Sequence, residues 1–357
     1  MEDPDALDMM TLPRNITPRL KEPFTVPVLL LVFNRTDLTR RVFQRIREAK
    51  PAMLFIAADG PRCYREHDSR HCEDVRLEVS KIDWPCEVHR LYQDSNLGCK
   101  AAVSTAISWF FEHVEEGIIL EDDCLPDPSF FPYCAELLER YRDEPRVAMI
   151  SGSQLLSGKE LQHRPASYYF SKYPNIWGWA TWRRTWRNYD VTLSEWNGDS
   201  GSLRRIANGR VRRRFARRFE AVKAGCIDTW DYQLVHHCLT TDSLCVTPTV
   251  NLVENIGFDA RATHTIEPVC ENAPAKALEM PIPMIHPETM DVDEKADIQM
   301  ETRVFRVPAN LWVSLWWSCG KRRAKLATWF RKSHETRQPC LTNNPPQPLE
   351  SPDSNSG

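Results

Sequence analysis

Three consecutive acidic residues, Glu121, Asp122 and Asp123, directly follow a short apolar run at 117–120. Neighbouring carboxylates repel one another, and each needs solvent or a cation to stay ionised. Mg²⁺ and Mn²⁺ favour carboxylate oxygens and commonly bind through one or two protein carboxylates plus substrate phosphates. The triplet therefore predicts a site for a divalent metal and a diphosphate, with a solvated acidic turn as the alternative.

Indole side chains are concentrated in a second segment. Trp177, Trp179 and Trp182 lie close together in the sequence, and Gly178 permits a close backbone approach between two of them. Because aromatic rings present a flat apolar face, we expect these residues to stack on sugar rings or to form the rim of a binding cleft. Burial in an apolar core is the alternative.

Alternating strands and helices must position these residues. Apolar runs at 28–33, 54–58, 86–91, 117–120 and 147–150 predict strands. The first run is apolar on both parities, as in a strand that is covered on both faces. The segments between them predict helices, including 65–82 and 129–142. This pattern predicts an α/β fold with a Rossmann-like, open, mostly parallel sheet flanked by helices, and a site at the carboxyl ends of the strands.

The length of 357 residues fits one catalytic domain with appendages. We expect a flexible tail at 1–24, a catalytic domain at 25–268, a linker or arm with an amphipathic C-terminal helix at 269–337, and a disordered tail at 338–357. Within the catalytic domain, 25–150 is the expected nucleotide-sugar half, and 151–268 is an irregular, aromatic-rich acceptor half.

Charge and cysteine usage exclude some classes of protein. A net charge of −3 gives no basic excess of the kind that nucleic-acid-binding domains show. The arginine-rich stretch at 204–218 predicts a solvated helix face, with contact to an anionic acceptor or a lipid phosphate as the alternative. The 12 cysteines are scattered without CxxC spacing, which favours free thiols. The oligomeric state is left open.

Two terminal segments bear on location. Residues 1–21 contain no apolar stretch behind a positive flank, so the sequence predicts neither a signal peptide nor an anchor, and a cytoplasmic location follows. Residues 311–332 combine tryptophans with lysines and arginines, which is typical of an interfacial helix that contacts an anionic membrane. Packing of that helix on the catalytic core is the alternative.

Four motifs occur in an order that carries a family resemblance. They are Phe33-Asn34-Arg35, Asp59-Gly60, the loop Asp94-Ser95-Asn96-Leu97-Gly98-Cys99-Lys100, and Ile118-Ile119-Leu120-Glu121-Asp122-Asp123. Over residues 26–265 the chain resembles nucleotide-diphospho-sugar glycosyltransferases of the glycosyltransferase A fold, especially the bacterial sugar-transferase-like group. Its Glu-Asp-Asp cluster looks like that of animal N-acetylglucosaminyltransferase I. The resemblance implies sugar transfer from a nucleoside diphosphate, uridine diphosphate in such relatives, to a glycan or lipid-linked acceptor, with Mn²⁺ or Mg²⁺ as cofactor.

The resemblance implies a role for several residues toward the nucleotide. Asn34 and Arg35 would face the nucleotide, and Asp59 would accept a hydrogen bond from a uracil ring nitrogen. Lys100 would approach the base or the phosphates at the amino end of a helix, where the helix field favours anions. Ordinary surface charge is the alternative for Arg35 and Lys100, and turn stabilisation is the alternative for Asp59.

The implied metal site draws on two parts of the chain. Asp123 would bind the metal directly, while Glu121 and Asp122 would contact the donor sugar or the ribose. Residues 251–265 look like the late segment that supplies a histidine, which makes His264 the second metal ligand. Neutral imidazole is an acceptable ligand for Mn²⁺. A loop or packing role is the alternative for His264.

Transfer to a hydroxyl also requires a base, because an alcohol is a poor nucleophile until its proton is removed. Asp231 and, second, Asp228 precede an apolar-aromatic helix and sit where inverting relatives place a catalytic carboxylate. A helix amino end favours the ionised form. Helix capping is the alternative for Asp228, so Asp231 is the preferred base, and an inverting in-line displacement is the expected reaction.

Two other functions compete with this interpretation. A sugar-phosphate nucleotidyltransferase needs a glycine-rich phosphate loop after the first strand, whereas residues 34–38 contain no glycine. A non-catalytic carbohydrate-binding or scaffold protein would be expected to lack part of the acidic cluster, yet Glu121, Asp122, Asp123, Asp231 and His264 are all present.

Overall fold

The computed structural model describes residues 24–156, 161, 164–258 and 275–305. These residues belong to one compact unit, 1–307, and a second unit, 308–357, is not described. The expected tails, the candidate membrane segment 311–332 and His264 therefore lie outside the described residues. In the described part of the chain, no helix combines the length and the apolar character that a membrane span requires.

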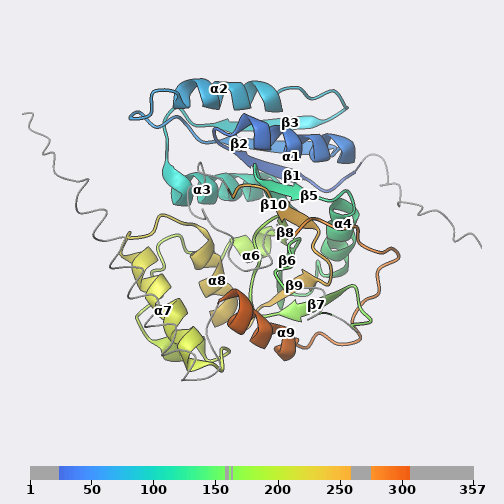
Figure 1. The fold of residues 1–357 in the computed structure, drawn as a ribbon, viewed down its shortest axis with the longest axis vertical. Helices are drawn as coiled ribbons and strands as arrows, with labels where there is room; N and C mark the ends of the chain where they lie inside the picture. The colour runs from blue at the N-terminus through green and yellow to red at the C-terminus, as the bar shows by residue number, and fades with distance from the viewer. Residues whose placement is uncertain (1–23, 157–160, 162–163, 259–274, 306–357) are drawn as a thin grey trace, which may run out of the picture. The chain divides into compact units, whose positions relative to one another are not determined.

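The first half of the chain alternates strands and helices, as predicted (Figure 1). Its elements are β1 (Val28–Val32), α1 (Thr36–Ala49), β2 (Met53–Ala58), α2 (Asp68–Val79), β3 (Glu87–Tyr92), α3 (Gly98–His113), β4 (Glu116–Glu121), β5 (Cys124–Pro126), α4 (Phe130–Arg140) and β6 (Val147–Ser151). Helix α2 is shorter than the predicted 65–82, because Asp68 at its first turn pairs with Arg62 and the chain between them forms turns.

The second half contributes strands to the same sheet. Its elements are β7 (Tyr168–Ser171), β8 (Trp179–Trp182), α6 (Arg183–Trp186), the 3₁₀ helix η1 (Ser200–Leu203), α7 (Gly209–Lys223), α8 (Asp231–Thr240), β9 (Leu244–Pro248), β10 (Val253–Asn255), α9 (Glu294–Gln299) and the π-helical turn η2 (Met300–Val304). The helix expected within 204–218 begins later, at Gly209, because the Asn208 side chain caps it by accepting from the Arg210 amide at 3.0 Å.

The central sheet has eight strands in the order β3-β2-β1-β4-β8-β6-β9-β7. The first four are mutually parallel. Strand β8 is antiparallel to both of its neighbours, β9 is parallel to β6, and β7 is antiparallel to β9. Only β8 and β7 therefore oppose the common direction, which confirms a Rossmann-like, mostly parallel α/β sheet. A separate two-stranded pair joins β10 to β5.

Alternate residues of β1 enter different cores, as the apolar run on both parities predicted. Val28, Leu30 and Val32 pack with buried residues of α1, α2 and α4. Leu29 and Leu31 pack on the other face with buried residues of α3 and α8. The sheet is therefore covered by helices on both faces, which leaves the carboxyl ends of β1, β2 and β4 as the edge where a site can form.

The predicted arm does not begin a separate region at residue 269. Within the described stretch 275–305, Asp297 on α9 is fully buried and accepts hydrogen bonds from the Ser171 hydroxyl and, at 3.2 Å, from the Lys172 amide. The Tyr173 hydroxyl donates to Glu301 at 2.7 Å. These contacts place α9 and η2 on the last strand of the sheet, so the expected boundary at 268 is corrected: this part of the arm belongs to the same compact unit as the sheet.

Candidate functional site

A cavity of about 1260 Å³ opens at the carboxyl ends of β1, β2 and β4. It collects most of the residues that the sequence singled out: Asn34, Arg35, Asp59, Glu121, Asp122, Asp123, Trp177, Asp228 and Asp231. Lys100, Trp179 and Trp182 do not line it. Residues from both halves of the chain therefore meet in one space.

The acidic triplet follows β4 and is paired with Arg35, which follows the adjacent strand β1. The guanidinium group of Arg35 forms ion pairs with Asp122 and, at 2.9 Å, with Asp123. Its side chain is only 16% exposed, so the pairing is largely shielded from solvent. Arg35 thus contacts the carboxylates directly. Its expected contact with the nucleotide stays a prediction.

The triplet is electrostatically strained because one guanidinium faces three carboxylates. Burial raises the pKa of Glu121, and the negative charges of Asp123 and Asp122 raise it further. Burial also raises the pKa of Asp122, although Arg35 opposes that change. Because the pKa values of both Glu121 and Asp122 are raised, additional positive charge at the site would stabilise their ionised forms.

The late segment around residue 255 is folded against the triplet. Strand β10 pairs with β5, and the Ile256 amide donates to the Asp123 carbonyl at 2.8 Å. A Cβ added to Gly257 would lie 2.2 Å from Oδ2 of Asp123, so only glycine fits at this approach. The chain that leads toward His264 therefore passes beside Asp123. Among the described residues, no three His, Cys, Asp or Glu side chains form a metal-binding group.

Asp59 closes the loop that follows β3 onto the end of β2. Its Oδ1 accepts from the Gly60 amide at 2.8 Å and the Leu97 amide at 2.9 Å, and its Oδ2 accepts from Asn96 Nδ2 at 2.7 Å. Burial raises the pKa of Asp59, while these donors act in the opposite direction. Turn stabilisation, the alternative role, is therefore present. A carboxylate oxygen accepts more than one hydrogen bond, so Oδ2 keeps capacity toward the cavity.

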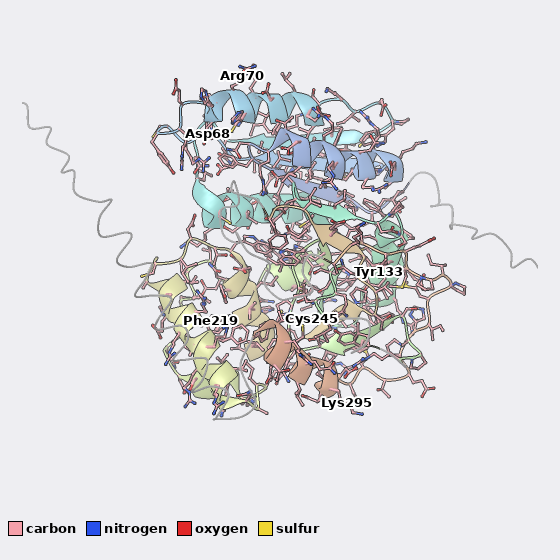
Figure 2. All side chains as sticks on the ribbon, in the orientation of Figure 1. Asp68, Arg70, Tyr133, Phe219, Cys245 and Lys295 are labelled. Atoms are coloured by element: carbon pink, nitrogen blue, oxygen red, sulfur yellow. The ribbon has the colours of Figure 1, made fainter. Side chains whose placement is uncertain are left out.

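Two further polar residues of the cavity were missed by the sequence reasoning. Asp68 is buried at the start of α2, accepts from Asn34 Nδ2 at 3.0 Å, and forms an ion pair with Arg62. Arg62 also lies over the Phe33 ring, with its guanidinium carbon 5.1 Å from the ring centroid. Figure 2 shows Asp68 at this end of α2. The polar loop after Asp59-Gly60 was the available signal, but nothing local links it to the first strand.

Asp228 binds the amino end of α3 rather than the helix that follows it. Its carboxylate accepts from the backbone amides of Cys99 at 2.9 Å and Lys100 at 3.2 Å. Gly98 has φ +81° and lies so close that an added Cβ would be 2.7 Å from Asp228 Oδ2. The Asp228 carboxylate thus occupies the backbone amides at this helix end, and Lys100 does not line the cavity. The expected approach of the Lys100 side chain to the base or the phosphates stays a prediction.

Asp231 is the first residue of α8 and lines the cavity. Its Oδ1 accepts from the Thr229 hydroxyl and from the Tyr232 amide, the latter at 2.9 Å. Within the described chain, Oδ2 has no hydrogen-bond partner. A carboxylate held through one oxygen with the other oxygen available at a cavity wall has the arrangement that a general base requires.

The three tryptophans have different positions. Trp177 is partly buried, lines the cavity, and makes an edge contact with Phe258 at 5.7 Å between ring centroids. Trp179 is 1% exposed and stacks on Trp230 at 5.7 Å, and Trp182 is 3% exposed beneath Arg184. The expected acceptor contacts of Trp179 and Trp182 are therefore corrected to core packing, because strand β8 lies inside the sheet.

Comparisons with known proteins identify no family. No protein-family model matches the chain, and no curated protein matches its sequence. Solved structures that align with parts of it include apo UDP-glucose pyrophosphorylase, at 13% identity and a TM-score of 0.28, over 48% of this chain and 80% of that one. A cytidylyltransferase from Leptospira borgpetersenii serovar Hardjo-bovis aligns at 9% identity and a TM-score of 0.27, over 46% of this chain and 63% of that one. Mouse xyloside xylosyltransferase 1, apo form, aligns at 11% identity and a TM-score of 0.29, over 61% of this chain and 82% of that one. At such TM-scores these similarities carry no argument about function.

Proposed function

We propose that the protein is a glycosyltransferase that moves a sugar from a nucleoside diphosphate, uridine diphosphate by the resemblance, to a hydroxyl of a glycan or lipid-linked acceptor. The observation that carries the proposal is the single cavity that joins Asp59, the acidic triplet and Asp231. The proposed reaction gives each of them a role: Asp59 as the carboxylate that binds the nucleobase, the triplet as the diphosphate site, and Asp231 as the proton acceptor.

The residues at the triplet fit a divalent metal. Asp123 is 17% exposed, and Mg²⁺ and Mn²⁺ often take one or two carboxylates while phosphate oxygens complete the coordination. Arg35 balances only part of the negative charge of the cluster. Asp123 and His264 are the proposed protein ligands, with Glu121 and Asp122 toward the donor sugar or ribose. When bound, the metal would neutralise charge on the departing diphosphate.

Asp231 is the proposed base, because one of its oxygens is fixed by Thr229 and Tyr232 while the other is available to an acceptor hydroxyl. Asp228, the second candidate, is less suited because both of its oxygens accept backbone amides of α3. Proton removal by a carboxylate that faces the donor supports an inverting displacement.

The nucleotidyltransferase alternative is disfavoured by the connection after β1. Only Phe33, Asn34 and Arg35 separate β1 from α1, and no glycine opens that turn. A glycine-rich phosphate loop therefore has no room between these two elements. The non-catalytic alternative is tested by the experiment below.

Thermal unfolding with a panel of nucleoside diphosphates, each with and without Mn²⁺, tests the proposal. A ligand that binds only the folded state at 100 times its Kd adds about 2.7 kcal/mol of stability. We expect a metal-dependent rise in Tm with one nucleotide, and loss of that rise in Asp123→Ala. Asp143→Ala, an exposed acidic residue outside the cavity, is the matched control and should keep it.

The outcomes separate the two functions. An unshifted Tm with every nucleotide in the wild-type protein would favour the non-catalytic alternative. A nucleotide-dependent rise that survives in Asp123→Ala would refute the metal assignment and leave the nucleotide site in place.

A further inference from the structure

Helix α7 carries an arginine-rich face for which the proposed reaction has not yet given a use. Arg213, Arg214, Arg217 and Arg218 are all exposed, and we call these four residues the α7 basic face. They form two rows at i and i+4, in which side chains are about 5–6 Å apart. The other side of the helix, including Phe215 and Phe219, is buried against the third core cluster (Figure 2 marks Phe219 on α7).

The positive charge of this face is not balanced by acidic neighbours. No acidic side chain in the described ranges forms an ion pair with any of the four arginines. Glu220 is the one acidic residue of α7, and it accepts a hydrogen bond from the Trp196 indole at 2.8 Å. Four cations without an acidic partner in the described ranges create a local positive potential that attracts anions, even in a chain whose net charge is −3.

The helix that carries the basic face is a neighbour of α8, the helix that begins with Asp231. Helix α7 packs against α8, and the Phe219 ring contacts the Tyr232 ring with centroids 6.4 Å apart. Tyr232 directly follows Asp231. The pKa of Tyr232 is raised by burial and by Asp231, and it is lowered by Arg218 and Arg214, so both arginine charges act within electrostatic range of the Tyr232 hydroxyl.

The side-chain chemistry narrows the class of anion. The face contains arginine and no lysine, and guanidinium groups bind phosphate, sulfate and carboxylate oxygens in a bidentate way. An interfacial membrane helix exposes aromatic or aliphatic residues beside its basic ones. The large exposed apolar residues of the described chain include none on α7. A soluble molecule with several oxyanions therefore fits better than a bilayer.

We propose that the α7 basic face binds an acidic glycan, a sugar chain that carries several phosphate, sulfate or carboxylate groups, and that this glycan is the acceptor whose hydroxyl reaches Asp231. The acceptor assignment rests on the proposed function. Binding of the glycan to α7 is a separate property that can be measured without any donor.

Calorimetric titration of the full chain with a heparin-derived hexasaccharide tests the inference. The variant Arg214→Gln/Arg217→Gln/Arg218→Gln is compared with Arg41→Gln/Arg70→Gln/Arg187→Gln, which removes the same charge from exposed positions outside α7 and the cavity. We expect the α7 variant to lose about tenfold or more in affinity and the control variant to lose less than about twofold. Nucleotide binding should be unchanged in both, which also shows that both are folded.

Each of the following outcomes would overturn the inference or its acceptor assignment. Equal losses in the two variants would mean unspecific attraction to net charge. Equal binding of an oligonucleotide of matched charge would mean a general polyanion surface, and α7-dependent binding to phosphatidylcholine–phosphatidylserine vesicles without hexasaccharide binding would mean a membrane surface. Hexasaccharide binding without any nucleotide binding would refute the proposed function and the acceptor assignment with it. Nucleotide binding without hexasaccharide binding would refute this inference alone.

Discussion

At the scale of single residues, carboxylates with the same intrinsic chemistry differ in their surroundings. Both carboxylate oxygens of Asp228 accept hydrogen bonds from backbone amides, whereas Asp231 keeps one oxygen available at the cavity. Hydrogen bonds from two backbone amides hold the Asp228 carboxylate in place and prevent it from reaching a substrate. The distinction between base and cap is therefore made by geometry and not by residue type.

Asp231→Asn should reduce the rate of sugar transfer roughly a hundredfold or more, because general-base catalysis commonly contributes that much, while donor binding stays intact. The measurement is release of the nucleoside diphosphate from the sugar donor at saturating acceptor, together with donor affinity by calorimetry. Asp228→Asn serves as the comparison: its amide oxygen can accept from only one of the two α3 amides, so stability should fall, but most activity should remain. A fully active Asp231→Asn enzyme would exclude Asp231 as the base.

The sequence could predict which residues meet at the cavity better than what each one contacts. Asp59 and the acidic triplet directly follow β2 and β4, and strand ends in a parallel sheet lie at one edge. The Arg35–Asp122 ion pair and the burial of Trp179 depend on the strand order, which places β1 beside β4 and β8 inside the sheet. Residue spacing carries no information about that order.

At the scale of elements, the amino end of α3 couples the two halves of the chain. Gly98 begins the helix at φ +81°, and its missing Cβ makes room for the Asp228 carboxylate. That carboxylate supplies acceptors to two amides that would otherwise have no partner in the helix. The loop before α8 is therefore fixed to the first half by a cap contributed from a distant part of the sequence.

Asp228→Ala should lower the free energy of unfolding by about 1 kcal/mol, as loss of a helix cap commonly does. Gly98→Ala should also destabilise, because alanine disfavours the positive φ and its Cβ would collide with Asp228. In the double variant the collision is absent, so its loss of unfolding free energy should be smaller than the sum of the losses in the two single variants. Urea denaturation of the four proteins measures this, and strict additivity would contradict the contact.

At the scale of the whole molecule, one sheet joins regions that differ in composition. The parallel strands β1 to β4 were predicted from the βα repeats, whereas β8 enters between β4 and β6 and reverses direction. The predicted division at 268 failed for a related reason. Proline-rich, acidic sequence resembles a linker, yet Asp297 and Glu301 accept hydrogen bonds from Ser171 at the end of β7 and from Tyr173 just after it, far away in the chain.

The attachment of α9 makes stability depend on pH in a defined direction. Burial raises the pKa of Asp297 to about 6, against the opposing effects of Ser171 and Lys172. The folded state therefore binds a proton more tightly than the unfolded chain, whose aspartates titrate near an ordinary pKa of about 4. The contribution of Asp297 to stability is largest below about pH 4 and declines as the pH rises to about 6.

Asp297→Asn removes this titration and keeps a polar side chain that can accept from Ser171. The difference in unfolding free energy, wild type minus variant, should fall between about pH 4 and pH 6 and then level off. Denaturation across that range measures the difference. Asp291→Asn, an exposed acidic residue before α9, should give a flat difference. A difference for Asp297→Asn that rises with pH would show that pairing with Lys172 outweighs burial, and that α9 is held by an ion pair and not by a protonated hydrogen bond.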